Sequence, residues 1–178
     1  SSPGSSVEQN NSITIPSYNR RNWPHWIDQD NDCQNTRHEI LIRDSTEPVR
    51  FKTSKRCRVI AGKWIGPYTG QTFLQASDLD IDHLVPLAHA YRNGGALWSR
   101  ERKMAFANDP DNLLAVDDFT NQSKGSKGPA KWMPPKKDYW CKYFEKWKTV
   151  KTRYNLNTSK QEEYILKAIQ QECDGAAW

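Results

Sequence analysis

The chain has 178 residues, with 26 Lys or Arg against 21 Asp or Glu, a net charge of +5 and a pI of about 9.0. This length suits one domain with a sizeable core, and no apolar run approaches the ~20 residues of a membrane helix. The opening "SSPGSS" is typical of a flexible N-terminus or an expression remnant. We therefore expect residues 1–15 to lie outside a single domain that covers residues 16–178.

The segment that follows Cys33 predicts a β-hairpin. Residues Thr36 to Asp44, "TRHEILIRD", are expected to form a strand, and a turn near Ser45 to Pro48 leads into a returning strand, "VRFKTSKRCRVI". Folding back about this turn would bring Cys57 opposite Cys33. The sequence thus predicts a disulfide between these two cysteines.

A short strand, a long connection, a second strand and a short helix are expected in the middle of the chain. "SDLDIDHLVP" alternates apolar and acidic residues and predicts a strand that ends at Asp82 and His83. An inserted helix is expected from about Trp98 to Ala107, and a second strand from Asn112 to Val116. The short helix after it would begin at Asp117 or Asp118 and end at Gly125. This part, about residues 78–125, is the core of an expected α+β fold.

Basic residues concentrate in the last third of the chain. Residues 122–160 hold ten Lys and Arg153 against two acids, Asp138 and Glu145, so their local charge of +9 exceeds that of the whole chain. A basic face on a nearly balanced protein suggests a polyanionic partner, most commonly nucleic acid. Electrostatic attraction of nucleic acid, independent of its base sequence, is expected from Lys136, Lys137, Lys142, Lys146 and Lys148. The alternative is a solvated lysine-rich helix face.

Two C-terminal helices are expected to pack antiparallel. Asp138 is a candidate cap for the first, and Ser159 begins the second with a capping box that ends at Glu162. Packing across the short "NLNT" loop would bring Cys141 to Cys173. The apolar positions that predict these helices are Tyr139, Tyr143, Trp147, Val150, Ile165, Leu166 and Ile169.

The two expected disulfides, Cys33–Cys57 and Cys141–Cys173, indicate an oxidising compartment, and therefore a secreted protein, extracellular or periplasmic. The alternative is four buried free thiols in a cytoplasmic protein. The cysteine spacing does not match a structural zinc site.

The central residues suit phosphodiester hydrolysis, which needs a base to deprotonate water and a cation to stabilise the phosphate. His83 titrates near neutral pH and is the candidate base. Asp82 and Asn121 offer the oxygen ligands that Mg²⁺ prefers. Asp80 is expected on the opposite strand face from Asp82 and His83, and His89 receives no role.

The ordered segments "DIDHLVP", "NLLAV" and "NQSKG" resemble the HNH motif of the ββα-metal nucleases, with Asn in place of the final His. Together with "WIDQDNDCQNTRHEIL", "GKWIGPYTG" and "KWMPP", they resemble secreted HNH endonucleases of the DUF1524 type, from Trp26 to Cys173. The resemblance implies a ββα-metal core with an added hairpin and C-terminal helices. It also implies His83 as general base, and Asp82 and Asn121 as ligands of one Mg²⁺, which Mn²⁺ could replace. Asn112 would tie the loop after the first strand to the second strand and orient His83.

Further residues are expected to contact substrate. The resemblance places "TRHE" near the active site, so Arg37 is a candidate clamp for the phosphate, with a surface ion pair to Glu39 as the alternative. Lys124 and Lys127 flank glycines just after Asn121 and are expected to bind phosphates from a flexible loop. Trp132 is expected at the rim of the site.

The sequence therefore predicts a secreted, metal-dependent, largely sequence-nonspecific endonuclease that acts as a monomer. DNA is the expected substrate, double strands included, and RNA stays open. The alternatives are an HNH toxin domain with an immunity partner, a nonenzymatic basic DNA-binding module, and a secreted protein whose basic face binds anionic cell surfaces.

Overall fold

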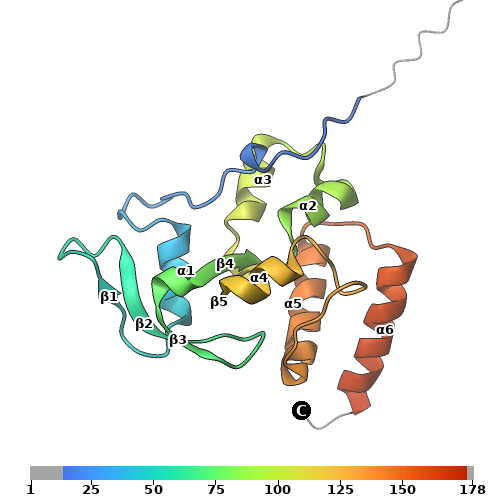
Figure 1. Ribbon diagram of the computed structural model, residues 1–178. Helices are drawn as coiled ribbons and strands as arrows, with labels where there is room; N and C mark the ends of the chain where they lie inside the picture. The colour runs from blue at the N-terminus through green and yellow to red at the C-terminus, as the bar shows by residue number, and fades with distance from the viewer. Residues whose placement is uncertain (1–13, 176–178) are drawn as a thin grey trace, which may run out of the picture.

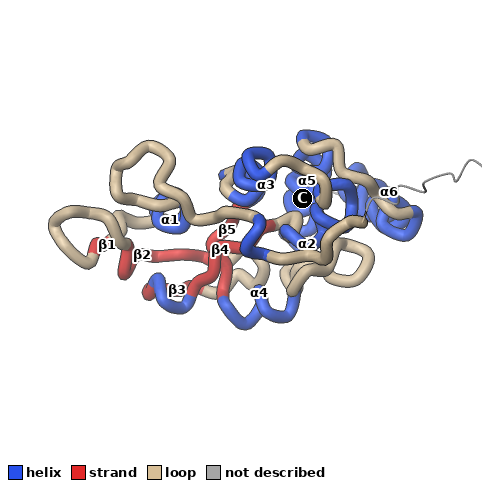
Figure 2. The backbone as a smooth tube through the Cα atoms, turned by 90° about the horizontal axis from the view of Figure 1, so that it is seen from above, coloured by secondary structure: helices blue, strands red, loops and turns tan. Residues whose placement is uncertain are grey.

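Two small β-sheets lie among helices in the computed structural model, which describes residues 14–175. One end of the molecule holds the three-stranded sheet with helix α1, and the other end holds α5 and α6 (Figure 1). The two-stranded sheet lies between them, as the view from above also shows (Figure 2). The mixed α+β class is thus confirmed, and most of the expected segment 1–15 lies outside the described residues.

The central sheet consists of β4 (Leu79–His83) and β5 (Leu113–Asp117), which pair antiparallel from Leu79 opposite Asp117 to His83 opposite Leu113. Helix α4 (Asp118–Lys124) follows directly, because the Asp117 carboxylate caps it by accepting from the Thr120 amide. It ends at Gly125, whose φ of +56° favours glycine. The predicted strand, connection, strand and helix are confirmed in this order.

The connection between β4 and β5 is largely helical. It contains α2 (Leu87–Ala90), a kinked turn over Tyr91–Gly95, α3 (Arg100–Ala107) and a 3₁₀ turn over Pro110–Asn112. Helix α3 begins two residues later than predicted, since the Ser99 hydroxyl accepts from the Arg102 amide and caps it.

The predicted strand over Thr36–Asp44 is wrong, because this segment is helix α1. The Asn35 side chain accepts from the His38 amide and starts the helix, and the buried Ile40 and Leu41 face β2, β4 and β5. The observed hairpin lies further along the chain. It pairs β1 (Arg50–Phe51) with β2 (Val59–Ile65), and β3 (Thr72–Gln75) joins the other edge of β2.

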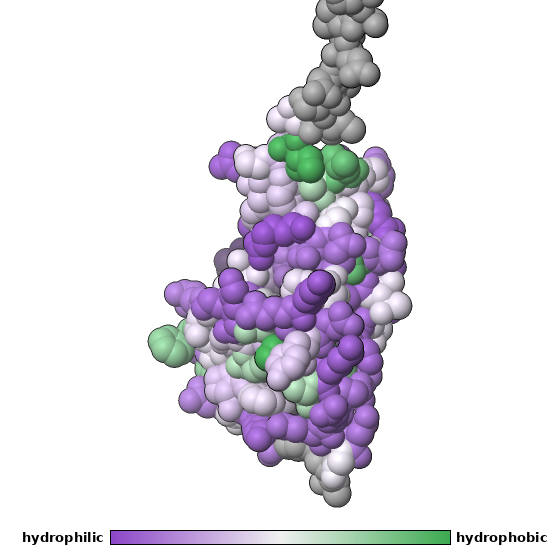
Figure 3. Space-filling view, turned by 90° about the vertical axis from the view of Figure 1, so that its right-hand side faces the viewer, coloured by the Kyte–Doolittle hydropathy of each residue, from purple (hydrophilic) through white to green (hydrophobic). Residues whose placement is uncertain are grey.

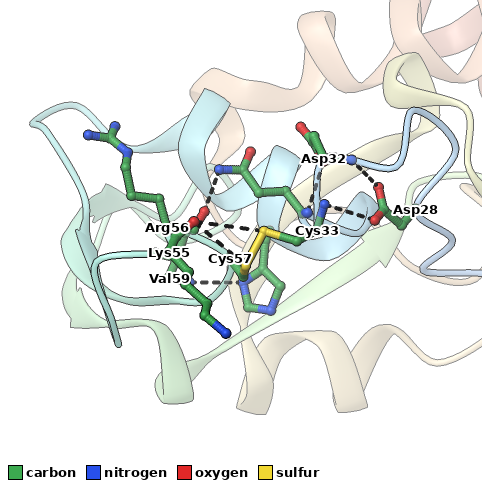
Figure 4. Close-up of a disulfide and its surroundings, with 9 residues drawn as sticks. Asp28, Asp32, Cys33, Lys55, Arg56, Cys57 and Val59 are labelled. Carbon is green, nitrogen blue, oxygen red and sulfur yellow. Dashed lines mark hydrogen bonds between the residues drawn. A yellow bond between two sulfur atoms is a disulfide. The ribbon is translucent and has the colours of Figure 1, made fainter.

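Both predicted disulfides are confirmed. Cys33 lies before α1 and Cys57 before β2, so their bond joins the helix to the three-stranded sheet (Figure 4). Close to it, the Nδ1 atom of His38 accepts from the Val59 amide, 3.1 Å away. The predicted pairing was therefore right, although the segment that follows Cys33 is a helix and not a strand.

Helices α5 (Trp140–Arg153) and α6 (Lys160–Gly175) pack together, and Cys141–Cys173 joins the start of one to the end of the other. Ser159 caps α6 as predicted, by accepting from the Glu162 amide. The expected cap at Asp138 is wrong, because a 3₁₀ turn over Lys137–Tyr139 precedes α5. The face beside α6 is mostly hydrophilic (Figure 3).

Within residues 14–175 no helix combines the length and apolarity needed to cross a membrane.

Candidate active site

A cavity of about 340 Å³ opens where β4 ends, between α4 and the N-terminal segment. It brings together three of the residues that the sequence predicted, His83, Asp82 and Asn121. The remaining lining residues are Tyr18, Arg20, Ile81, Pro86, Leu87, Ala88, Gly125 and Ser126.

The His83 imidazole is held in one orientation. Its Nε2 atom lies 2.8 Å from the carbonyl oxygen of Ala107. A carbonyl only accepts hydrogen bonds, so Nε2 carries the proton and Nδ1 keeps a free lone pair. Burial lowers the pKa of His83 to about 3, and the positive charge of Arg20 acts in the same direction. The side chain is therefore a neutral proton acceptor at physiological pH.

Asp82 is buried beside two hydrogen-bond donors. The Tyr68 hydroxyl donates to its Oδ2 atom at 2.6 Å, and the Lys124 ammonium lies 3.1 Å from Oδ2 and 3.2 Å from Oδ1. Burial raises the pKa of Asp82, and Lys124 and Tyr68 oppose this rise. Because Lys124 is fully buried as well, the carboxylate is compensated by a cation inside the protein.

Asn121 is oriented by Asp80. The Asn121 amide nitrogen donates to the Asp80 carboxylate at 3.1 Å, which leaves the amide oxygen available for another partner. The expectation that Asp80 lies on the opposite strand face from Asp82 is wrong. Both side chains contact α4, because residues two apart on a strand share a face.

The donor atoms in this cavity fit a hard divalent cation. Asp82 supplies carboxylate oxygen and Asn121 an amide oxygen, and both line the cavity next to His83. Lys124 cancels the charge of the carboxylate, so any cation would be held weakly. In residues 14–175, a group of three neighbouring carboxylates is found elsewhere, at Asp28, Asp30 and Asp32, and Figure 4 shows Asp28 and Asp32 near the Cys33 disulfide.

Asn112 joins the loop after β4 to the start of β5. Its side-chain oxygen accepts from the Val85 amide at 2.8 Å, and its side-chain nitrogen donates to the Val85 carbonyl at 3.0 Å. The Leu84 amide also donates to the Asn112 carbonyl. These bonds fix the backbone that follows His83, and Asn112 does not touch the imidazole itself.

Four predicted substrate contacts do not line this cavity. The Arg37 guanidinium donates to the carbonyls of Leu79 and Ala76, and the residue lines another cavity with His38. Lys124 belongs to the inner face of α4 and not to a flexible loop, and its ammonium donates to Asp82 and to the His83 carbonyl.

The other two residues lie further along the chain. Lys127 is exposed and borders a neighbouring cavity. Trp132 is half-buried against Tyr68, with ring centroids 5.2 Å apart, and so belongs to the core more than to a rim.

The N-terminal segment contributes residues that sequence reasoning missed. Tyr18 and Arg20 line the cavity, and Trp26 stacks on His83. The only signal in the sequence was an aromatic and basic stretch, "YNRRNWPHW", which does not show where it folds. Tyr68 was missed too, because its contact with Asp82 joins residues 14 apart in the chain.

The fold and the cavity define a disulfide-bonded α+β domain with a His, Asp and Asn cluster at the end of a two-stranded sheet. Residues 35–171 match the family described as the C-terminal domain of GmrSD restriction endonucleases, and the chain belongs to this family. It is 41% identical over 158 residues to an "Uncharacterized secreted protein" of the fungus Arthroderma benhamiae, covering 88% of this chain and 76% of that one. No solved structure matches the chain.

Proposed function

We propose that this protein is a secreted, metal-dependent endonuclease that hydrolyses phosphodiester bonds in DNA. The observation that carries the proposal is a neutral, oriented His83, with Nδ1 left to accept a proton, in the same cavity as Asp82 and Asn121. Membership of a family described by restriction endonucleases supports the same class of reaction. The β4–β5–α4 unit would then be a ββα-metal core of the HNH type.

In the proposed reaction, His83 accepts a proton from water at Nδ1, and the resulting hydroxide attacks phosphorus while the bond from phosphorus to the leaving 3′ oxygen breaks. When Nδ1 takes up this proton, Nε2 keeps its own proton and still donates to the Ala107 carbonyl, which holds the ring in place. Asp82 and Asn121 would hold one Mg²⁺, replaceable by Mn²⁺, whose chemistry is to stabilise charge on the phosphate and the leaving oxygen. Asn112 positions the backbone around the base.

Arg20 is the cation that the cavity offers to the phosphate, in the role that the sequence suggested for Arg37. Its charge lowers the pKa of His83 in the free protein. A bound phosphodiester would bring one negative charge, which offsets the effect of Arg20 and so raises the pKa of His83. The imidazole would thus become a better base when substrate is present.

Substrate recognition would be largely blind to sequence. The charged and polar side chains in the cavity suit a phosphate, and its lining offers no evident set of contacts for a base edge or a 2′-hydroxyl. Double-stranded DNA is the proposed substrate, and RNA is the first competitor to assay. The two disulfides and the secreted relative support secretion, and a monomer is the proposed state.

Plasmid DNA incubated with the protein and Mg²⁺, with and without EDTA, tests this function. Cleavage should disappear with EDTA, and His83→Ala should lower its rate by about 10²- to 10⁴-fold. Asn121→Ala should also lose activity, while Gln122→Ala, an exposed neighbour on α4, should keep it. Intact DNA and RNA with the parent protein would refute the proposal, and retained binding without cleavage would favour a nonenzymatic DNA-binding module.

A further inference from the structure

A second and larger cavity of about 520 Å³ adjoins the candidate active site, and Ser126 lines both. Three parts of the chain enclose it: the end of α2 with the turn after it, the loop after α4, and the start of α6. Its lining residues are His89, Arg92, Asn93, Ser126, Lys127, Gly128, Ala130, Lys131, Ser159, Gln161 and Glu162.

Three exposed cations surround this cavity: Arg92, Lys127 and Lys131. Within residues 14–175 none of them pairs with a carboxylate. Arg92 donates to the Ser126 carbonyl and Lys127 to the Ser123 carbonyl, and each keeps further N–H groups for a ligand. The cavity therefore offers three positive charges with no internal counterion.

The acid at the base of the cavity does not cancel these charges. Glu162 is buried, and Lys151 lies 3.1 Å from its Oε2 atom. His89 completes the cluster by accepting from the Lys151 ammonium at 2.9 Å. Burial lowers the pKa of His89 to about 3, so the imidazole is neutral. The charges of Glu162 and Lys151 cancel, so the three surrounding cations determine the net charge of the cavity.

The buried cluster also fixes the loop that carries two of the cations. A Cβ atom at Gly128 would lie only 3.2 Å from Glu162, 3.2 Å from Trp147 and 3.3 Å from His89, so the loop backbone rests directly on these side chains. The Lys131 amide donates to the Gly128 carbonyl and the Lys127 amide to the Lys124 carbonyl, and these hydrogen bonds fix the loop backbone. Lys127 and Lys131 are thus presented from an ordered loop.

We propose that this cavity is a phosphate subsite, which holds the backbone of the nucleic-acid strand beside the bond that is cleaved. The proposal rests on the proposed nuclease function, since the shared Ser126 would lead one strand from the first cavity into the second. Among residues 14–175, His89 is the one ring that lines it, and because this ring is buried a base finds no stacking surface; the ligand is therefore the phosphodiester backbone.

Salt-dependent binding distinguishes this subsite from general attraction by basic residues. A fluorescent DNA oligonucleotide would be titrated at several salt concentrations with the His83→Ala protein, in which we expect cleavage to be slow and binding to be kept. The subsite variant carries Arg92→Ala, Lys127→Ala and Lys131→Ala. A control with the same change in net charge carries Lys137→Ala, Lys142→Ala and Lys148→Ala, three exposed lysines that line neither cavity.

The subsite variant should reduce the slope of log K against log salt by about 2 to 3, since each lost phosphate contact removes about 0.7 to 0.9. The control should change the slope by less than about 1. Equal changes in the two variants, no change in either, or no DNA binding by the parent would overturn the subsite. A separate cleavage assay of the protein with His83 intact tests the nuclease function, so the two failures are distinguishable.

Discussion

Trp26 lies flat against His83, with ring planes 2° apart and centroids 5.4 Å apart. The indole belongs to the N-terminal segment, which precedes the residues that match the family. It covers an imidazole whose pKa is lowered to about 3 chiefly by burial. The chain outside the family match therefore contributes to the surroundings of the candidate base.

Trp26→Ala should expose His83 and raise its pKa towards the ordinary value of about 6.5, because water can then solvate the imidazolium. Trp26→Phe keeps an aromatic ring over the imidazole and should change the pKa much less. NMR titration of the His83 ring protons measures both values. An unchanged pKa in the alanine variant would show that other groups bury the imidazole.

Lys124→Met should destabilise the protein by about 3 to 5 kcal/mol, because Asp82 would be left buried without its cation. The exposed Lys127→Met is the matched control and should change the free energy of unfolding by less than about 0.5 kcal/mol. Urea denaturation of both variants measures the difference. A similarly small effect of both would mean that Asp82 does not depend on the ion pair.

The central unit could be predicted because its signals are local. Alternation in Leu79–His83, the apolar run Leu113–Val116, the cap at Asp117 and the glycine at 125 each act over a few residues. Those four signals give β4, β5 and α4 in order, and α4 then runs back along β4, so that Asn121 contacts Asp80 and Lys124 contacts Asp82.

The contacts that complete the site could not be predicted, because they join residues far apart in the chain. Lys124 was expected in a flexible loop beside glycines, yet α4 extends through it and turns it inward to a carboxylate 42 residues away. The segment that holds Arg37 was expected to be a strand, whereas the cap at Asn35 starts a helix and the guanidinium donates to two carbonyl groups.

The stability of the protein should fall in acid through His89. The unfolded chain binds a proton at this residue below pH 6.5, while the folded protein does so only near pH 3. The contribution of His89 to the free energy of unfolding is therefore fully present above pH 6.5 and is lost as the pH falls towards 3. The difference between the pKa values of His89 in the unfolded and the folded chain corresponds to roughly 4 to 5 kcal/mol, at 1.36 kcal/mol for each pH unit.

His89→Gln removes this titration but keeps an acceptor for the Lys151 ammonium. Denaturation of both proteins at several pH values should show a shallower fall in stability between pH 6.5 and 3 for the variant. Parallel curves would mean that His89 binds its proton equally well in the folded and unfolded chains.

Loss of the Cys141–Cys173 disulfide should lower stability more than activity. The bond closes a sequence separation of 32 residues, so Cys141→Ser with Cys173→Ser should cost about 3 to 4 kcal/mol. Neither cysteine lines the candidate active site, and cleavage at low temperature should stay within about twofold of the parent. Thermal unfolding and cleavage rates measure the two effects, and a large loss of activity in the folded variant would connect the C-terminal helices to catalysis.

Arg20 and Arg21 are consecutive exposed residues on one 3₁₀ turn, but only Arg20 lines the cavity with His83. Arg20→Ala should therefore lower cleavage by about 10- to 100-fold, since a charge-assisted contact to phosphate contributes about 1.5 to 3 kcal/mol. Arg21→Ala removes the same charge from the same turn and should leave the rate within about twofold.

The two arginines also differ in their effect on the base. Without Arg20, the pKa of His83 should rise, because a positive charge that disfavours the imidazolium is gone. The pH at which activity begins should move upward with it, whereas Arg21→Ala should leave the profile unchanged. Added guanidinium should partly restore cleavage by Arg20→Ala alone. Equal rates and equal pH profiles for the two variants would exclude Arg20 as the phosphate contact.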